Sequence, residues 1–135
     1  MYAKWNPKDV EFASTHFKAA LEFDPNHAES MLCLADCLGF LATTGFIPQM
    51  EAWKEVEVLI KKALFINNDL PNGHYQLVNL LFFSKGDYEG SFKAASKAIA
   101  LNSNFGEAHQ YLSFLYILAG DAKNAKKTFR KRNYD

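Results

Sequence analysis

Hydrophobic residues recur every three or four positions along most of the chain, which is the spacing of one face of an α-helix. In one segment Phe92, Ala95 and Ile99 follow this spacing, with lysine and serine residues between them. Such a segment is typical of an amphipathic helix that packs on one side and is solvated on the other. Between residues 108 and 118, by contrast, apolar residues surround nearly the whole predicted helix, which therefore needs cover on several sides. The pattern predicts two alternating kinds of helix.

The turn signals between these helices repeat at a fixed distance. Gly86 and Asp87 are followed 34 residues later by Gly120 and Asp121. A glycine takes the left-handed conformation that ends a helix, and an aspartate caps the next helix by accepting hydrogen bonds from its free amides. Self-similarity at such a period indicates stacked helix pairs, in which each pair needs its neighbours to bury its apolar face.

The second helix of each pair can be traced towards the N-terminus by a recurring alanine residue. Ala98 and Ala63 lie 35 residues apart, whereas Ala63 and Ala20 lie 43 apart, so the unit between the last two holds about nine additional residues. These residues predict a longer helix pair with Phe46 and Ile47 near its tip, where self-packing is favoured over a contact site. The chain thus has four copies of a second helix and three of a first, about seven helices in all.

This pattern resembles that of the tetratricopeptide repeat (TPR) family, and the resemblance covers nearly the whole chain. The residues that carry it are Leu34, Ala35, Leu38, Val56, Ile60 and Ala63 in the first full copy, Tyr75, Val78, Phe82, Gly86, Asp87 and Ala98 in the second, Leu112, Tyr116, Gly120, Asp121, Ala125 and Phe129 in the third, and Ala13, Phe17, Ala20 and Pro25 in a leading half-copy. The resemblance implies an all-α, right-handed superhelical solenoid of antiparallel helix pairs. It divides a single domain, residues 1–135, into a half repeat at 8–23, a repeat with an extended hairpin at 27–67, a repeat at 71–102 and a terminal repeat at 105–133.

The resemblance also implies a docking scaffold that binds a peptide or a partner's helix in a concave groove. Carried over position by position, the groove residues are Leu32 and Asp36 in the first full copy, Gln76, Leu77, Leu80 and Phe83 in the second, and Gln110, Tyr111, Phe114 and Leu118 in the third. This lining is apolar and aromatic, which favours an apolar partner; burial of the same residues against neighbouring helices is the alternative. No catalytic motif is found, so we expect no enzymatic activity.

One branch of the family grips acidic C-terminal peptides of chaperones through a carboxylate clamp of Lys, Asn, Asn, Lys and Arg. The corresponding residues here are Leu32, Asp36, Leu77, Glu107 and Tyr111. The resemblance therefore predicts no binding to acidic chaperone tails.

The charge balance narrows the range of partners. The chain has 15 basic and 15 acidic residues and a formal net charge of 0, so no overall field draws it to nucleic acid or to an anionic membrane. Basic residues cluster near the C-terminus, at Lys123, Lys126, Lys127, Arg130 and Lys131. They are interpreted as the solvated face of a terminal helix, and a nucleic-acid patch, the alternative, has no interleaved aromatic residues to support it. We therefore predict a protein or peptide partner without nucleic-acid or membrane contact.

The cysteines and the N-terminus bear on the compartment. Cys33 and Cys37 lie four residues apart, which places both thiols on one face of a helix and favours buried thiols in a reducing compartment. The four histidines are scattered, so we expect no metal site and no cofactor. The N-terminus lacks the apolar core of a secretory signal, and no run reaches the roughly 18 apolar residues of a membrane span. The expected location is the cytoplasm.

The first repeat lacks its first helix, so the apolar side of residues 9–22, with Phe12, Phe17 and Leu21, has no obvious cover. Two interpretations follow: the chain is a segment of a longer protein, or its open end pairs with another molecule. A homo-oligomerisation module, such as a homodimer, is thus the alternative to the docking scaffold. The general pattern is also similar to TPR segments of bacterial transcriptional regulators and nucleotide cyclases, which implies a module of a larger signalling or transcription-regulatory protein.

Overall fold

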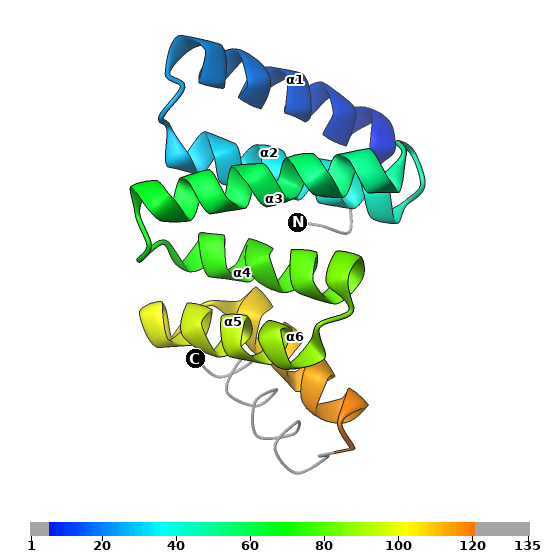
Figure 1. Ribbon diagram of the computed structural model, residues 1–135, viewed down its shortest axis with the longest axis vertical. Helices are drawn as coiled ribbons and strands as arrows, with labels where there is room; N and C mark the ends of the chain where they lie inside the picture. Colours follow the sequence, from blue (N-terminus) through cyan, green and yellow to red (C-terminus); the bar gives the residue numbers. More distant parts are fainter. Residues whose placement is uncertain (1–5, 121–135) are drawn as a thin grey trace. The chain divides into compact units, whose positions relative to one another are not determined.

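The computed structural model describes residues 6–120, and every regular element in that part of the chain is helical (Figure 1). The chain forms two compact units that meet in sequence between Asn68 and Asp69, here called unit 1 (residues 6–68) and unit 2 (residues 69–120). The predicted all-α class is confirmed. The predicted seventh helix and the basic cluster at residues 123–131 lie outside the described residues.

Unit 1 contains α1 (Pro7–Phe23), α2 (Ala28–Thr43) and α3 (Gln49–Ile66). The first helix begins where Asn6 caps it, because the Asn6 side chain accepts a hydrogen bond of 3.0 Å from the Asp9 amide. The second helix packs against both of its neighbours, and most of its residues are buried. It therefore forms the centre of the unit.

The core between α1 and α2 is built from Val10, Cys37 and Leu41, with Phe17 and Ile47 packed around them. The hairpin that follows is made of α2, with 16 residues, and α3, with 18 residues, against 14 for α5 (Tyr88–Leu101). Near its tip, Ile47 turns back into this core whereas Phe46 remains 44% exposed. The additional residues thus extend the packing of unit 1.

Unit 2 begins with α4 (Pro71–Asn79), which continues as a π-helix, η2 (Leu80–Lys85). Gly86 ends it with a φ of 63°, and the amides of Gly86 and Asp87 both donate to the Leu81 carbonyl oxygen. The Asp87 side chain then caps α5 by accepting a hydrogen bond of 2.8 Å from the Gly90 amide. The glycine and aspartate turn predicted from the sequence is confirmed.

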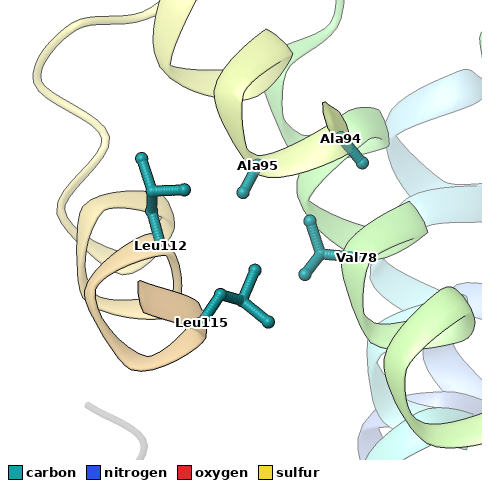
Figure 2. Packing of buried hydrophobic residues seen from close by; sticks show 5 residues of the cluster. All are labelled: Val78, Ala94, Ala95, Leu112 and Leu115. Atoms are coloured by element: carbon teal, nitrogen blue, oxygen red, sulfur yellow. The ribbon is translucent and has the colours of Figure 1, made fainter. Parts of the chain in front are cut away.

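The last described helix is α6 (Gly106–Leu118), which is followed by Gly120 with a φ of 80°. Helices α4, α5 and α6 share one core, in which the side chains of Val78, Ala95, Leu112 and Leu115 converge (Figure 2). The small Ala95 side chain is 0% exposed and lets α5 approach its neighbours closely. Each buried leucine or valine contributes about 1.5–3 kcal/mol of transfer free energy to this core.

Candidate partner-binding surface

Aromatic side chains from three elements of unit 2 gather around Phe82 in η2. The Phe82 ring centroid lies 5.0 Å from that of Phe83, 5.3 Å from Tyr88, 5.6 Å from Phe114 and 5.9 Å from Tyr111. Most of these pairs meet edge to face or tilted, the arrangements that the quadrupoles of aromatic rings favour. We call these five residues the aromatic cluster.

The local backbone explains why two consecutive phenylalanines both join the cluster. In a π-helix the hydrogen bonds run from residue i to i+5, so one turn holds more residues than an α-helical turn. Successive side chains are then rotated less about the axis, and Phe82 and Phe83 can remain in ring contact with each other while Leu80 stays buried. Single π-helical turns of this kind occur frequently at functional sites.

The outer part of the cluster is open to solvent. Phe83 is 54% exposed, Phe114 is 44% exposed and Tyr88 is 60% exposed, whereas Phe82 and Tyr111 beneath them are half-buried. Further along α6, Ile117 and Leu118 are exposed as well. A contiguous apolar surface of this kind is typical of a protein interaction site.

The structure separates the predicted groove residues by exposure. Phe83, Gln110, Phe114 and Leu118 are exposed; Asp36, Leu77 and Tyr111 are half-buried; Leu32, Gln76 and Leu80 are buried. The three buried residues, at 0 to 2% exposure, belong to the packing rather than to an open binding surface. Leu32 and Asp36 lie in unit 1, so the surface described here is formed by the residues of unit 2.

Sequence reasoning missed Tyr88 as a site residue. Tyr88 is the first residue of α5, and the tight turn at Gly86 and Asp87 brings its ring to 5.3 Å from Phe82. The signal that could have found it is the run of aromatic residues on both sides of the turn, Phe82, Phe83 and Tyr88.

Two buried polar atoms of α6 find no hydrogen-bond partner, the Tyr111 hydroxyl and the His109 Nδ1. The other ring nitrogen of His109 lies 2.7 Å from the Ser103 carbonyl oxygen, which it meets as a donor. Burial raises the pKa of Tyr111, so its hydroxyl remains protonated at neutral pH. Because buried polar groups are normally paired, these two atoms are exceptions among the described residues of unit 2.

Buried polar side chains also occur on α4. The Gln76 side chain is 2% exposed, accepts from Asn79 at 3.3 Å and donates to Asn72 at 3.4 Å. These long hydrogen bonds join residues three and four positions apart on one helix face. The Gln76 amide therefore makes both hydrogen bonds within α4 and is not free to contact the aromatic cluster.

The thiols lie away from this surface, in unit 1. Both Cys33 and Cys37 are free; Cys37 is buried, as predicted, whereas Cys33 is only half-buried. Burial, followed by the nearby Asp36 carboxylate, raises the pKa of Cys37 to about 11. Burial also raises the pKa of Cys33. A thiol held protonated in this way is a poor nucleophile.

Metal and membrane chemistry were also assessed over residues 6–120. Within that part of the chain, no three His, Cys, Asp or Glu side chains gather in a way that could hold a metal ion. Among the described helices, none combines the length and the hydropathy needed to cross a membrane.

The residues proposed for self-association divide between core and surface. Phe12 is 66% exposed, with its ring edge-to-face on His16 at 4.6 Å. Phe17 and Leu21 are half-buried, and Phe17 packs into the core between α1 and α2. Phe23, at the end of α1, is 94% exposed and was not among the predicted residues.

Comparison with known proteins was made on both sequence and structure. The sequence matches no family model and no curated protein sequence. The structure is similar to a thermophilic TPR protein of Thermus thermophilus, with a TM-score of 0.79 at 18% identity over 91% of this chain and 63% of that one. The fold is that of a TPR protein.

Two further solved structures agree with this assignment. Residues 41 to the end of MamA from Desulfovibrio magneticus RS-1 align with a TM-score of 0.68 at 21% identity, over 93% of this chain and 65% of that one. A double mutant of MamA from RS-1 aligns with a TM-score of 0.67 at 21% identity, over 92% and 64%. The chain thus spans 63 to 65% of the length of these three structures. The predicted TPR-like solenoid class is confirmed.

Proposed function

We propose that this TPR-like chain is a non-enzymatic docking module that binds an apolar segment of a partner protein on the aromatic cluster of unit 2. The observation that supports this most directly is the exposure of Phe83, Tyr88 and Phe114 above the half-buried Phe82 and Tyr111. An aromatic surface held in place by packed rings loses little side-chain entropy when a ligand covers it. Aromatic residues of this kind supply much of the binding energy at protein interfaces.

The chemistry of the surface favours one class of ligand. Covering each exposed aromatic side chain contributes about 1.5–3 kcal/mol of gross transfer free energy, before the costs of association. The surface therefore suits an apolar helix or an extended segment that buries two or three large side chains.

Acidic peptides are poor candidates for this site. The residues that correspond to the carboxylate clamp of chaperone-binding relatives are Leu32, Asp36, Leu77, Glu107 and Tyr111, and two of them are themselves acidic. Of these positions, unit 2 contributes the acidic Glu107 together with Leu77 and Tyr111, which offer a ligand carboxylate no positive charge. We expect no saturable binding of acidic C-terminal peptides.

The test uses the full chain and a displayed library of uncharged and weakly basic peptides rich in leucine and phenylalanine. Peptides selected on the wild-type chain are titrated by calorimetry against Phe114→Lys, which places a charge in the cluster. Phe65→Lys is the matched control, because Phe65 is 93% exposed on α3 in unit 1. We expect Phe114→Lys to weaken binding by tenfold or more, about 1.4 kcal/mol, and Phe65→Lys to leave it unchanged.

Two results would contradict the proposal. Equal affinity of the wild-type and Phe114→Lys chains would remove the aromatic cluster from the binding site. Equal losses in Phe114→Lys and Phe65→Lys would show non-specific hydrophobic capture. Circular dichroism of each variant controls for folding.

Homo-oligomerisation through α1 is the second candidate function. Phe12 and Phe23 favour it, because these two large apolar side chains of one helix are 66% and 94% exposed. Light scattering over a hundredfold range of concentration tests it with the double variant Phe12→Lys and Phe23→Lys. A wild-type dimer that this variant dissociates would support self-pairing through α1, and a monomer at every concentration would exclude it.

The wider context of the module rests on the sequence alone. Its proposed place is in a larger signalling or transcription-regulatory protein of the bacterial cytoplasm. The general similarity of its repeat pattern to TPR segments of such proteins supports this, as do the two free thiols.

A further inference from the structure

Charged side chains are sparse on α4, η2 and α6, which together carry the aromatic cluster apart from Tyr88. Along these three elements the Asp, Glu, Lys and Arg residues are limited to Lys85 and Glu107. Lys85 is the last residue of η2, and Glu107 lies in the first turn of α6. The position of each charge therefore matters for the ligand that this surface selects.

The two charges lie at opposite ends of the surface. Ring contacts show that α4 with η2 runs alongside α6 in the same direction. Near the start of both, the Tyr75 ring centroid lies 6.3 Å from that of Tyr111, and further along both, the Phe82 centroid lies 5.6 Å from that of Phe114. The acidic charge is thus at the end where α4 and α6 begin, and the basic charge is at the end where η2 stops.

Glu107 is an exposed carboxylate with aromatic neighbours. Among the described residues it has no ion-pair partner. Tyr111 follows it by four residues, the spacing at which two side chains on a helix are neighbours. The Tyr75 ring lies 6.3 Å from the Tyr111 ring and 5.2 Å from that of Phe105, the residue before α6, and all three rings are half-buried. An unpaired carboxylate therefore lies next to partly accessible aromatic rings.

We infer that this end of the surface binds a basic side chain of the docked segment, with arginine favoured over lysine. The inference rests on the proposed function, because the same segment places its apolar side chains on the aromatic cluster. A carboxylate attracts a cation, and an aromatic face within about 6 Å of the cation adds to this attraction. A guanidinium is planar, so it can stack on Tyr75 or Tyr111 and still donate two hydrogen bonds to the Glu107 carboxylate.

The place of Glu107 in the first turn of α6 also has an effect on the helix itself, since a carboxylate there interacts favourably with the positive end of the helix dipole. Glu29 occupies the same repeat position in α2. It lies five residues before Leu34, as Glu107 lies five residues before Leu112. Glu29 is exposed but belongs to unit 1, outside the aromatic cluster. A comparison of the two glutamates therefore separates ligand recognition from helix stabilisation.

The distance along α6 sets the spacing expected in the ligand. Glu107 and Phe114 are seven residues apart, which is about 10.5 Å along a helix axis. An extended segment covers roughly this length in three residues, and a helical segment covers it in seven. The basic residue is thus expected three or seven positions from the apolar residue that lies on Phe114, on the side remote from Lys85.

Calorimetry on the full chain tests this with the tightest peptide from the library selection. That peptide is synthesised in two further versions, in which Gln or Glu replaces its basic residue. Glu107→Gln is expected to weaken the basic peptide by about threefold and to leave the Gln version unchanged, and added salt should narrow the difference between these two peptides. Glu107→Lys should weaken the basic peptide by about tenfold and bind the Glu version more tightly than the wild-type chain does.

Glu29→Gln is the matched control. It removes the same charge from the same turn of an equivalent helix, so it reproduces the effects on net charge and on the helix dipole. It should leave the affinity for all three peptides unchanged. Circular dichroism during urea unfolding compares the stabilities of the two Gln variants.

Three results would overturn the inference. Selected peptides that share no basic residue at a fixed distance from their apolar residues would leave Glu107 without a ligand group. Equal affinity of the wild-type and Glu107→Gln chains for the basic peptide, together with a loss in Phe114→Lys, would keep the docking surface but remove Glu107 from it. Equal losses in Glu29→Gln and Glu107→Gln would show a general effect of net charge. Unchanged affinity in Phe114→Lys would instead contradict the proposed function itself.

Discussion

Equivalent positions in the two units hold side chains of opposite size, and the surfaces differ accordingly. Leu34 and Val78 are equivalent repeat positions, and so are Leu38 and Phe82, at the same separation in sequence. By that separation, Gly39 in unit 1 corresponds to Phe83 in unit 2. A Cβ atom on Gly39 would lie 3.4 Å from the Trp53 ring, which packs there and is 6% exposed. Phe83 is 54% exposed.

The comparison shows how one repeat pattern can produce either a closed core or an open surface. In unit 1 the missing side chain on α2 makes room for a tryptophan of α3, so the pair seals itself. In unit 2 the phenylalanine projects outward, and its ring lies against another ring, that of Phe82, at 5.0 Å. Closure depends on whether the facing helix carries a side chain that fills the space, which is a property of two positions rather than one.

The largest expected effect is a loss of stability when the closed packing of unit 1 is removed. Trp53→Ala should lower the free energy of unfolding by about 3–5 kcal/mol, because it leaves a cavity against Gly39. Phe83→Ala, the matched change on the open side, should cost less than about 1 kcal/mol. Urea unfolding followed by circular dichroism measures both. A Phe83→Ala cost as large as that of Trp53→Ala would show that Phe83 is part of a core.

A smaller effect comes from refilling the space at Gly39. Gly39→Leu should destabilise the protein by about 1–3 kcal/mol, since its added side-chain atoms have to displace the Trp53 ring. Gly39→Ala adds a single carbon at ordinary contact distance and removes a glycine from a helix, so a gain of up to about 1 kcal/mol is expected. If Gly39→Leu were neutral under the same urea assay, the close packing of α2 and α3 at this position would be disproved.

The smallest expected effect is a dependence on alkaline pH. The pKa of Cys37 rises from 9.0 to about 11 in the folded state, so the unfolded chain releases the thiol proton first as the pH increases. Stability from this group is complete below about pH 9 and is lost as the pH rises towards 11. Unfolding free energies measured across that range should fall less steeply in Cys37→Ala than in the wild-type chain.

Tyr111 provides the corresponding measurement in unit 2. Its pKa is also raised by burial, so its contribution is complete below its ordinary pKa of 10.0 and declines above it. Tyr111→Phe should reduce the slope of stability against pH at the upper end of the alkaline range. Identical slopes in all three chains would mean that neither group titrates differently in the folded state.

The helices and turns were within reach of the sequence because their causes are local. Gly86 is the residue that takes a positive φ, and Asp87 needs only the next three residues to cap α5. The period of 34 residues then implied stacked helix pairs without any knowledge of their contacts. The class of the fold followed from these two observations.

Part of the site was also predictable, and the remainder depended on packing across helices. Periodicity indicates which face of a helix a residue occupies, and Phe83 and Phe114 are exposed on theirs. It does not indicate how closely the next helix approaches, so Leu32 and Leu80, placed on the groove face with them, turned out to be buried. The change from α4 to the π-helix η2 left no mark in the sequence, since it alters hydrogen-bond register rather than residue type.

The sequence by itself determined that the chain is all-α and that it turns at Gly86 and Asp87. Only the tertiary structure decided that Trp53 closes over Gly39 and that Tyr88 joins the aromatic cluster across a turn. The reason is physical. Helix formation and capping depend on neighbours within a few residues, whereas burial depends on the sizes of side chains that meet from separate helices.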